Sequence, residues 1–168
     1  MFPIMLNIRG RKCTVAGGGN VAERKVKTLL KYGADVTAVS PVFKDRFPNV
    51  KRLEKEYSSS DIKNSFLVIA ATDNKEVNQT IYNDAKKRNI LVSLSDDTEH
   101  SDFILPSSKN YDDITISVST NGKSPALAKK ISQIKSNDLE LYASILPIIE
   151  KYRSILISES RDTMKKKY

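Results

Sequence analysis

Three consecutive glycines near the N-terminus are the residues whose type and spacing indicate a chemistry most clearly. Gly17-Gly18-Gly19 follows an apolar run at 12–16 and opens a segment, 20–32, whose apolar residues recur at three- and four-residue spacing. With Ala22 the segment reads G-x-G-x-x-A. Gly17 permits a tight turn, Gly19 lets the backbone approach a phosphate, and the small alanine lets the helix pack on the strand. Because a helix N-terminus offers free N–H groups and a positive dipole end, this turn predicts a dinucleotide pyrophosphate site.

The acidic residue that usually binds the ribose hydroxyls of a dinucleotide is missing. It should close the second strand about 20 residues after the glycines, but that region reads Ser40-Pro41-Val42. Ser40 offers a weaker hydrogen bond, whereas Lys44 and Arg46 offer charges that could contact a 2′-phosphate. These residues alone leave NAD and NADP open.

Polar side chains also follow the most continuous apolar run of the chain, 66–71. Thr72 and Asp73 come directly after it. Such a run is typical of a central parallel strand, and ligands bind beyond the carboxyl ends of such strands. We therefore expect Thr72 and Asp73 to face the cofactor crevice. Capping of the next helix by Asp73 or Asn74 is the alternative, and the two are compatible.

Asp96 and Asp97 leave the next apolar run, 90–94, at the same expected edge. A carboxylate there would lie near the nicotinamide end of a dinucleotide and could take or give a proton. Taken alone, two aspartates in a loop more often form turns, so both interpretations stay open. His100 is the only histidine of the chain; it cannot form a metal site by itself, and we expect it to be an exposed loop residue.

These residues need alternating strands and helices to position them. The patterns predict strands at 12–16, 35–40, 50–53, 66–71 and 90–94, and helices at 20–32, 61–64 and 74–89. The alternation predicts an α/β fold with a Rossmann-type parallel sheet and right-handed crossovers.

The pattern changes after residue 102. We expect strands at 103–106 and 114–119, and a helix that begins at Ser124-Pro125 and ends near 136. A further helix is expected from 138, with a break at Pro147. A nucleotide-binding domain is thus predicted over 1–112, a small α+β module over 113–145 and a C-terminal helical segment over 146–168.

Composition narrows the class of protein. The 168 residues are 39% hydrophobic and 29% charged, which is a globular profile, and no apolar run reaches the roughly 20 residues of a membrane span. The apolar start, 1–6, lacks a basic leader, and the single cysteine, Cys13, excludes an intrachain disulfide, so we expect a cytoplasmic protein.

The net charge of +8, part of it in the 165–167 tail, fits a solvated basic surface, a nucleic-acid partner or a polyanionic small molecule. No RNA- or DNA-binding motif accompanies it, so we expect no nucleic-acid partner.

The combination of motifs resembles the precorrin-2 dehydrogenase family, which includes the N-terminal part of siroheme synthase. The strings stand in family order: Pro3-Ile4 and Leu6, Val15–Lys25, Ile69–Asp73, Val77-Asn78, Asp96, Phe103–Ser107, Ile116–Thr120 and Gly122–Ala128. Together they cover residue 2 to about residue 130 and are far more specific than the glycine turn alone.

The resemblance implies an NAD-dependent oxidation of precorrin-2 to sirohydrochlorin, a step towards sirohaem. It also implies a homodimer, for which the module over 113–145 supplies contacts and part of the cleft. Family positions for NAD fall on Asn20-Val21 and on Pro41-Val42, which favours NAD and explains the absent acidic residue. The essential aspartate falls on Asp96, the candidate proton acceptor.

The resemblance extends to the substrate. Precorrin-2 carries eight carboxylates, and the segment Thr120, Gly122, Lys123 and Ser124 is the candidate for binding some of them. A serine reported as a modification site in some relatives falls on Thr120. Some members also insert ferrous iron, with the same aspartate, Asp96, implicated; no other metal ligand is expected.

The sequence departs from longer members in its short helical region after 146 and in having no methyltransferase region. We therefore expect no methylation, and chelation is less well supported than dehydrogenation. A non-catalytic dinucleotide-sensing domain is the alternative function. Such domains keep the acidic residue after the second strand and lack the 103–107 and 124–125 strings, which favours the enzyme.

Overall fold

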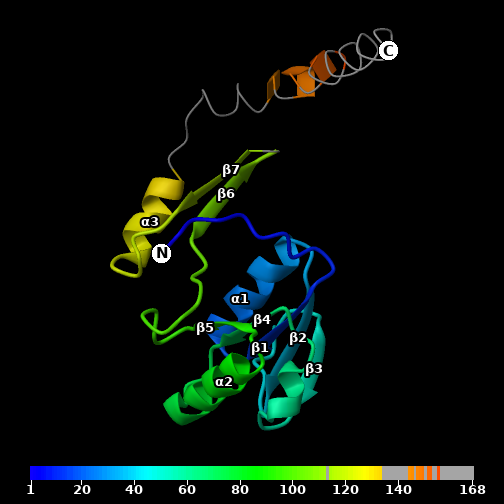
Figure 1. Ribbon diagram of the computed structural model, residues 1–168, viewed down its shortest axis with the longest axis vertical. Helices are drawn as coiled ribbons and strands as arrows, with labels where there is room; N and C mark the ends of the chain where they lie inside the picture. The colour runs from blue at the N-terminus through cyan, green and yellow to red at the C-terminus, as the bar shows by residue number, and fades with distance from the viewer. Residues whose placement is uncertain (113, 134–143, 146, 150, 153–154, 156–168) are drawn as a thin grey trace, which may run out of the picture. The chain divides into compact units, whose positions relative to one another are not determined.

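The computed structural model describes residues 1–112, 114–133, 144–145, 147–149, 151–152 and 155 (Figure 1). The chain forms two compact units, Met1–Ile104 and Leu105–Tyr168. No helix in the described part of the chain is long and apolar enough to cross a membrane.

The first unit is built on five strands that pair in parallel. They are β1 (Lys12–Ala16), β2 (Asp35–Ser40), β3 (Lys51–Glu54), β4 (Leu67–Ala70) and β5 (Leu91–Leu94). Their spatial order is β3-β2-β1-β4-β5, the order of the Rossmann fold, so the chain reverses its direction of travel between β1 and β4. The predicted α/β fold with a parallel sheet is confirmed.

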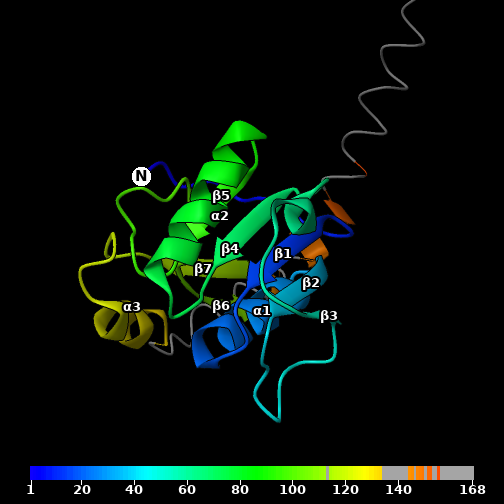
Figure 2. The same cartoon turned by 90° about the horizontal axis from the view of Figure 1, so that it is seen from below.

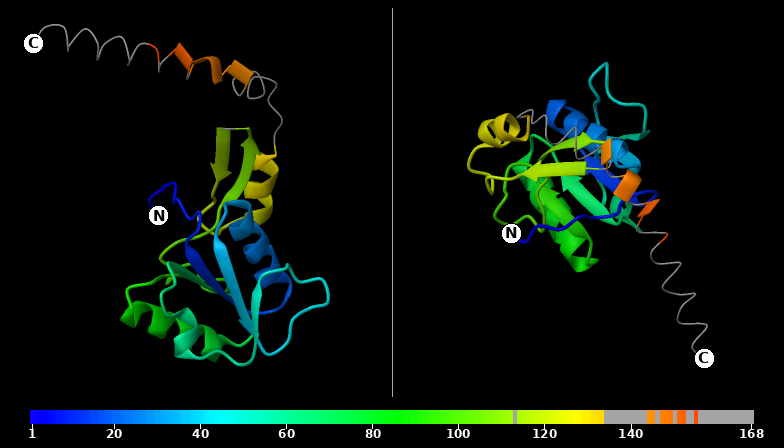
Figure 3. Two further views of the ribbon diagram at one scale, coloured as in Figure 1. Left: turned by 90° about the vertical axis from the view of Figure 1, so that its right-hand side faces the viewer. Right: turned by 90° about the horizontal axis from the view of Figure 1, so that it is seen from above.

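Two helices cover the sheet. Helix α1 (Asn20–Lys31) connects β1 to β2, and α2 (Lys75–Lys87) connects β4 to β5. Because both crossovers are right-handed but lead away from the centre in opposite directions, the two helices lie on opposite faces (Figures 2 and 3). A short 3₁₀ helix, η1 (Ser59–Ile62), precedes β4.

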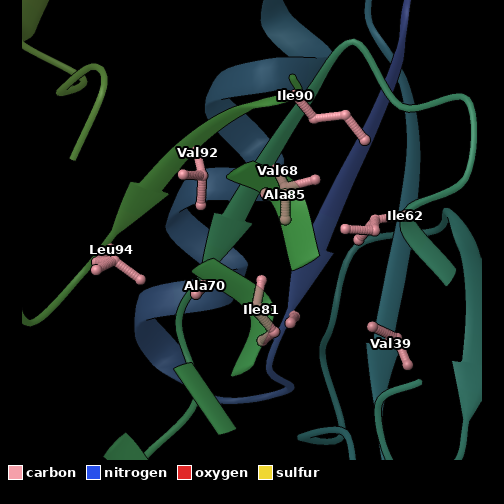
Figure 4. Packing of buried hydrophobic residues seen from close by; sticks show 10 residues of the cluster. Val39, Ile62, Val68, Ala70, Ile81, Ala85, Ile90, Val92 and Leu94 are labelled. Atoms are coloured by element: carbon pink, nitrogen blue, oxygen red, sulfur yellow. The ribbon is translucent and has the colours of Figure 1, made fainter. Parts of the chain in front are cut away.

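The core beside α2 is formed by aliphatic side chains from the sheet, α2 and η1 (Figure 4). Every residue of β4 is buried, as expected for a strand covered on both faces. Ile81 and Ala85 of α2 are fully buried against β4 and β5, and Ile62 of η1 closes the same cluster. The apolar run at 66–71 therefore forms a strand inside the sheet, between β1 and β5, where both of its faces are covered.

The second unit contains an antiparallel hairpin and one helix in its described part. β6 (Ser107–Tyr111) pairs with β7 (Ile114–Val118), and α3 (Pro125–Ser132) packs against both strands. Ser124 caps α3, because its side-chain oxygen accepts a hydrogen bond from the Leu127 N–H at 3.3 Å. The predicted start of this helix is confirmed. The helix predicted from 138 lies mostly outside the described residues.

The predicted strand at 103–106 is wrong. Pro106 has no N–H to donate to a ladder, and it is the polar segment that follows, β6, that pairs with β7. Lys109 pairs with Ile116 and Tyr111 with Ile114. Since β6 contains two serines, a lysine and an asparagine, its sequence has no apolar pattern that would predict a strand. The strand is recognised only from its pairing with β7.

The pairing of β6 with β7 places residues 105–112 in the second unit. The assignment of a separate dimerisation module to 113–145 and a helical segment to 146–168 stays a prediction.

Truncation of Ile81 tests the contribution of α2 to the first unit. Ile81→Ala leaves a cavity under α2 and is expected to lower the free energy of unfolding by about 2–5 kcal/mol. Urea unfolding followed by far-UV circular dichroism measures it. Gln79→Ala, at an exposed position of the same helix, is the control and should change the free energy by less than about 0.5 kcal/mol. Equal effects of the two variants would contradict the proposed packing.

Candidate active site

The glycine turn between β1 and α1 is shaped by contacts on two sides. Gly17 has φ = +124°, and a Cβ on it would collide with the Ala71 carbonyl oxygen. A Cβ on Gly18 would collide with the Val42 carbonyl oxygen. The protein's own packing therefore requires glycine at both positions.

Gly19 differs from the two glycines before it. It lies at the N-cap of α1 with φ = −89°, and a Cβ there would have no atom within 4 Å. Packing does not require glycine at this position, and the open space lies at the N-terminus of α1, whose first N–H groups have no partner within the helix. This geometry fits a pyrophosphate bound by backbone N–H groups at the positive end of the helix dipole.

The loop after β2 folds over the glycine turn. The Ser40 hydroxyl donates a hydrogen bond to the Val42 carbonyl at 2.7 Å, and the Lys44 N–H donates to the Gly18 carbonyl at 3.1 Å. The Ser40 proton is thus used within the loop. Binding of a ribose by Ser40, Pro41 and Val42 stays a prediction, with the loop in place beside the turn.

Lys44 joins this loop to α1 through charged groups. Its ammonium lies 2.6 Å from Glu23 Oε2 and 2.7 Å from Asn20 Oδ1, and Lys27 lies 2.6 Å from the other Glu23 oxygen. Hydrogen bonds from Lys27 and Lys44 lower the pKa of Glu23 to about 2, so the carboxylate stays charged at neutral pH. We call Glu23, Lys27 and Lys44 the Glu23 clasp. Of the two cations considered for a 2′-phosphate, Lys44 is paired and Arg46 is exposed.

Thr72 and Asp96 meet at the carboxyl edge of the sheet. Ala70 at the end of β4 pairs with Leu94 at the end of β5. Thr72 and Asp96 each follow two residues later, so they lie equally far beyond the ends of their strands. Asn78 of α2 lies between them: its Nδ2 donates to Asp96 Oδ2 at 3.2 Å and to the Thr72 carbonyl at 3.1 Å. The predicted approach of Thr72 and Asp96 at one edge is therefore seen in the structure.

The residues next to Thr72 and Asp96 have local roles. Asn74 is the N-cap of α2, because its Oδ1 accepts from the N–H groups of Glu76 and Val77. Asp73 is exposed beside it, and its predicted role towards the cofactor stays a prediction.

Asp97 closes the loop after β5. Its carboxylate accepts hydrogen bonds from the N–H groups of Glu99 and His100 and lies 2.7 Å from His100 Nδ1. The His100 N–H and ring lower the pKa of Asp97. Of the two aspartates, Asp97 forms the turn, and the predicted role of Asp96 in proton transfer stays a prediction. His100 is exposed, as predicted.

The candidate substrate residues lie in the second unit, in the loop between β7 and α3. The Thr120 carbonyl accepts from the Lys123 N–H at 3.0 Å, and Thr120 Oγ1 accepts from the Ser124 N–H at 2.9 Å. Gly122 has φ = +84°, which allows this tight turn. The binding of substrate carboxylates by these four residues stays a prediction.

Sequence reasoning gave no role to Asn78 beyond its place in a family string, and none to Gly18 or Glu23. One signal for Asn78 was present. It precedes Ile81 by three residues and Ala85 by seven, so a polar amide lies on the buried face of α2.

Among the described residues, no group of three or more His, Cys, Asp or Glu side chains could hold a metal ion.

Gly19→Ala separates ligand binding from folding at the turn. The methyl group meets open space in the protein and would project where the phosphates are expected. The variant should melt like the wild type and bind NAD at least about 10-fold more weakly, since it blocks close approach of the backbone. Thermal melting and NAD titration by fluorescence measure the two effects, and Gly17→Ala should instead lower the melting temperature. Unchanged NAD binding by Gly19→Ala would place the phosphates elsewhere.

Glu23→Gln tests whether the Glu23 clasp disfavours a 2′-phosphate. Removal of the carboxylate leaves Lys44 without its counter-charge, so binding of NADP should improve relative to NAD by about 3- to 5-fold at low ionic strength. Dissociation constants of both dinucleotides measure the ratio. Glu76→Gln, in the first turn of α2, is the matched control. A ratio that stays at its wild-type value would show that Lys44 does not face the 2′-position.

Comparisons with known proteins agree with this geometry. Residues 4–107 match a family described as "Putative NAD(P)-binding", and residues 112–131 match one described as "Sirohaem biosynthesis protein central". A siroheme synthase from Photobacterium profundum is 42% identical over 138 residues, which is 79% of this chain and 29% of that protein. One from Pseudoalteromonas atlantica is 34% identical over 177 residues, 99% of this chain and 38% of that protein. The chain thus spans about a third of the length of these curated relatives.

A solved structure is also similar to this chain. That of SirC, a precorrin-2 dehydrogenase, superposes with a TM-score of 0.71 at 26% identity and covers 92% of this chain and 79% of that one. The resemblance noted in the sequence is confirmed. Since the first family model covers more than half of the residues, the chain belongs to that putative NAD(P)-binding family, and a segment that matches the central region of sirohaem biosynthesis proteins follows it.

Proposed function

We propose that this chain catalyses the NAD-dependent dehydrogenation of precorrin-2 to sirohydrochlorin. The observation that carries the proposal is the position of Asp96. Its carboxylate lies at the carboxyl edge of the parallel sheet, the edge at which the glycine turn opens. The SirC structure and the siroheme synthases support the substrate and the direction of the reaction.

The groups at the turn fit NAD. Gly19 leaves space, the first N–H groups of α1 offer donors for the pyrophosphate, and the loop with Pro41 and Val42 lies beside them for the ribose. The chemistry that bound NAD would supply is that of a hydride acceptor for the oxidation of the macrocycle. The Glu23 clasp holds the loop on α1 and neutralises Lys44, which favours NAD over NADP.

The second product of the oxidation is a proton. When a carbon of precorrin-2 loses a hydride, the macrocycle also releases one proton as the new double bond forms, so a base is needed beside it. Asp96 provides that base: Asn78 holds one carboxylate oxygen, and the other is available to accept the proton.

The substrate is a polyanion, and the chain has a net charge of +8. A basic surface attracts and orients carboxylates. The turn from Thr120 to Ser124 is the proposed carboxylate-binding segment, with the Lys123 ammonium as its charged group, since the N–H groups of Lys123 and Ser124 already donate within the turn. The homodimer, ferrous iron as a further substrate and a cytoplasmic location rest on the family resemblance or on composition, and they remain part of the proposal.

A non-catalytic dinucleotide-sensing domain is the alternative function. Such a domain needs the dinucleotide site but has no use for a carboxylate at the end of β5. The presence of Asp96 there, with a buried amide donating to it, favours the enzyme.

Asp96→Asn tests the proposal. The amide keeps the size of the side chain but cannot accept the proton, so turnover should fall by at least about 100-fold. The dissociation constant for NAD should change by less than about 2-fold, because the proposed phosphate site follows β1, whereas Asp96 follows β5. Anaerobic conversion of precorrin-2, followed by absorbance, measures turnover. Asp97→Asn is the control and should keep most of the activity. Full activity of Asp96→Asn would remove the proposed base.

A further inference from the structure

We infer that Asn78 is a positioning residue that holds the Asp96 carboxylate in place for proton transfer. The inference rests on the proposed function and extends it to a side chain on α2. Asn78 is 2% exposed and lies on the face of α2 that packs on the sheet.

The Asn78 amide uses its full hydrogen-bonding capacity. Its Oδ1 accepts from the Thr72 hydroxyl at 2.7 Å and from the Thr72 N–H at 3.3 Å, and its Nδ2 donates to the Thr72 carbonyl and to Asp96 Oδ2. An amide offers two donors and two acceptor lone pairs, and here all four are used. A buried amide with every bond made is fixed in position and orientation.

The chemistry of the partners determines which way the amide faces. The Thr72 carbonyl and the Asp96 carboxylate only accept hydrogen bonds. Rotation of the amide by 180° would place Oδ1 against both acceptors and Nδ2 against the Thr72 N–H, so all of these contacts would become repulsive. The donor must therefore point at Asp96.

The position of the Asp96 carboxylate depends on the Asn78 donor, whereas the Asp97 carboxylate has several partners. In the part of the chain that the structure describes, Asn78 makes the one hydrogen bond to the Asp96 side chain. Asp97 has two backbone donors and the His100 ring. A carboxylate with one partner turns freely about its χ angles once that partner is lost. One oxygen of Asp96 is held, and the other stays available for a proton.

The hydrogen bonds between Asn78 and Thr72 join the end of β4 to the same amide that holds Asp96. Thr72 follows β4 and Asp96 follows β5, and a single amide from α2 joins both strand ends. Displacement of Thr72 and displacement of Asp96 are thus coupled through Asn78. A substitution of Asn78 is expected to disturb the geometry of the base while the phosphate site at the N-terminus of α1 is left intact.

The test compares kcat and KM of the full chain in the anaerobic precorrin-2 assay. Asn78→Ala removes the donor to Asp96, so kcat should fall by about 10- to 100-fold, while KM for NAD changes by less than about 3-fold. Asn83→Ala, the same exchange at an exposed position of α2, is the matched control and should keep both constants. Wild-type kcat in a folded Asn78→Ala variant, or a loss that appears only in KM for NAD, would overturn the inference.

A double-mutant cycle distinguishes positioning from general damage. If Asn78 acts through Asp96, adding Asn78→Ala to Asp96→Ala should lower the residual rate by less than about 2-fold. Multiplication of the two single effects would contradict a shared role. If Asn78→Ala does not fold, Asn78→Asp replaces it in the same measurements. It keeps the size and the acceptor towards Thr72 but exchanges the donor facing Asp96 for oxygen.

The outcomes also separate this inference from the proposed function. If the wild-type chain shows no NAD-dependent conversion, the proposed function fails, and with it the inference. If the wild type is active and Asp96→Ala is not, while Asn78→Ala keeps its kcat, the inference alone fails.

Discussion

The parallel pairing of β4 with β1 on one side and β5 on the other is the constraint on which the candidate site depends. It brings the carboxyl ends of three strands to one edge of the sheet, where the glycine turn, Thr72 and Asp96 follow β1, β4 and β5. A slip of one residue between β4 and β5 would turn the side chains of a strand to the opposite face and separate Asp96 from Asn78. Two hydrogen bonds continue the observed register past the strand ends: the Ala71 N–H donates to the Ala16 carbonyl, and the Ser95 N–H donates to the Ala70 carbonyl.

The glycine turn shows how packing and ligand binding divide three identical residues between them. Gly17 is required by the Ala71 carbonyl, which belongs to the segment that leads to Thr72, and Gly18 by the Val42 carbonyl in the loop after β2. The turn is thus held against both neighbouring strand ends. Only Gly19 faces open space, so the residue that packing leaves unconstrained is the one expected to approach the cofactor.

Much of the first unit could be predicted from sequence because its signals are local. The alternation of apolar runs and helical patterns predicted five strands and α1 and α2 to within one or two residues. β6 could not be predicted, since its polar residues form a strand only by pairing with β7. At the site, Asp96 and Asp97 could not be told apart by type. The structure separates them through partners from elsewhere in the fold, an amide of α2 for Asp96 and the backbone of its own loop for Asp97.

The proposed activity requires that the protein binds NAD and oxidises precorrin-2 beside it. The most direct measurement is the stoichiometry of an anaerobic single-turnover reaction with purified chain, precorrin-2 and NAD, followed by absorbance. We expect one NADH for each sirohydrochlorin that appears, and no sirohydrochlorin when NAD is omitted. Binding of NAD without any NADH formation would contradict the proposed activity and would favour a dinucleotide-sensing domain.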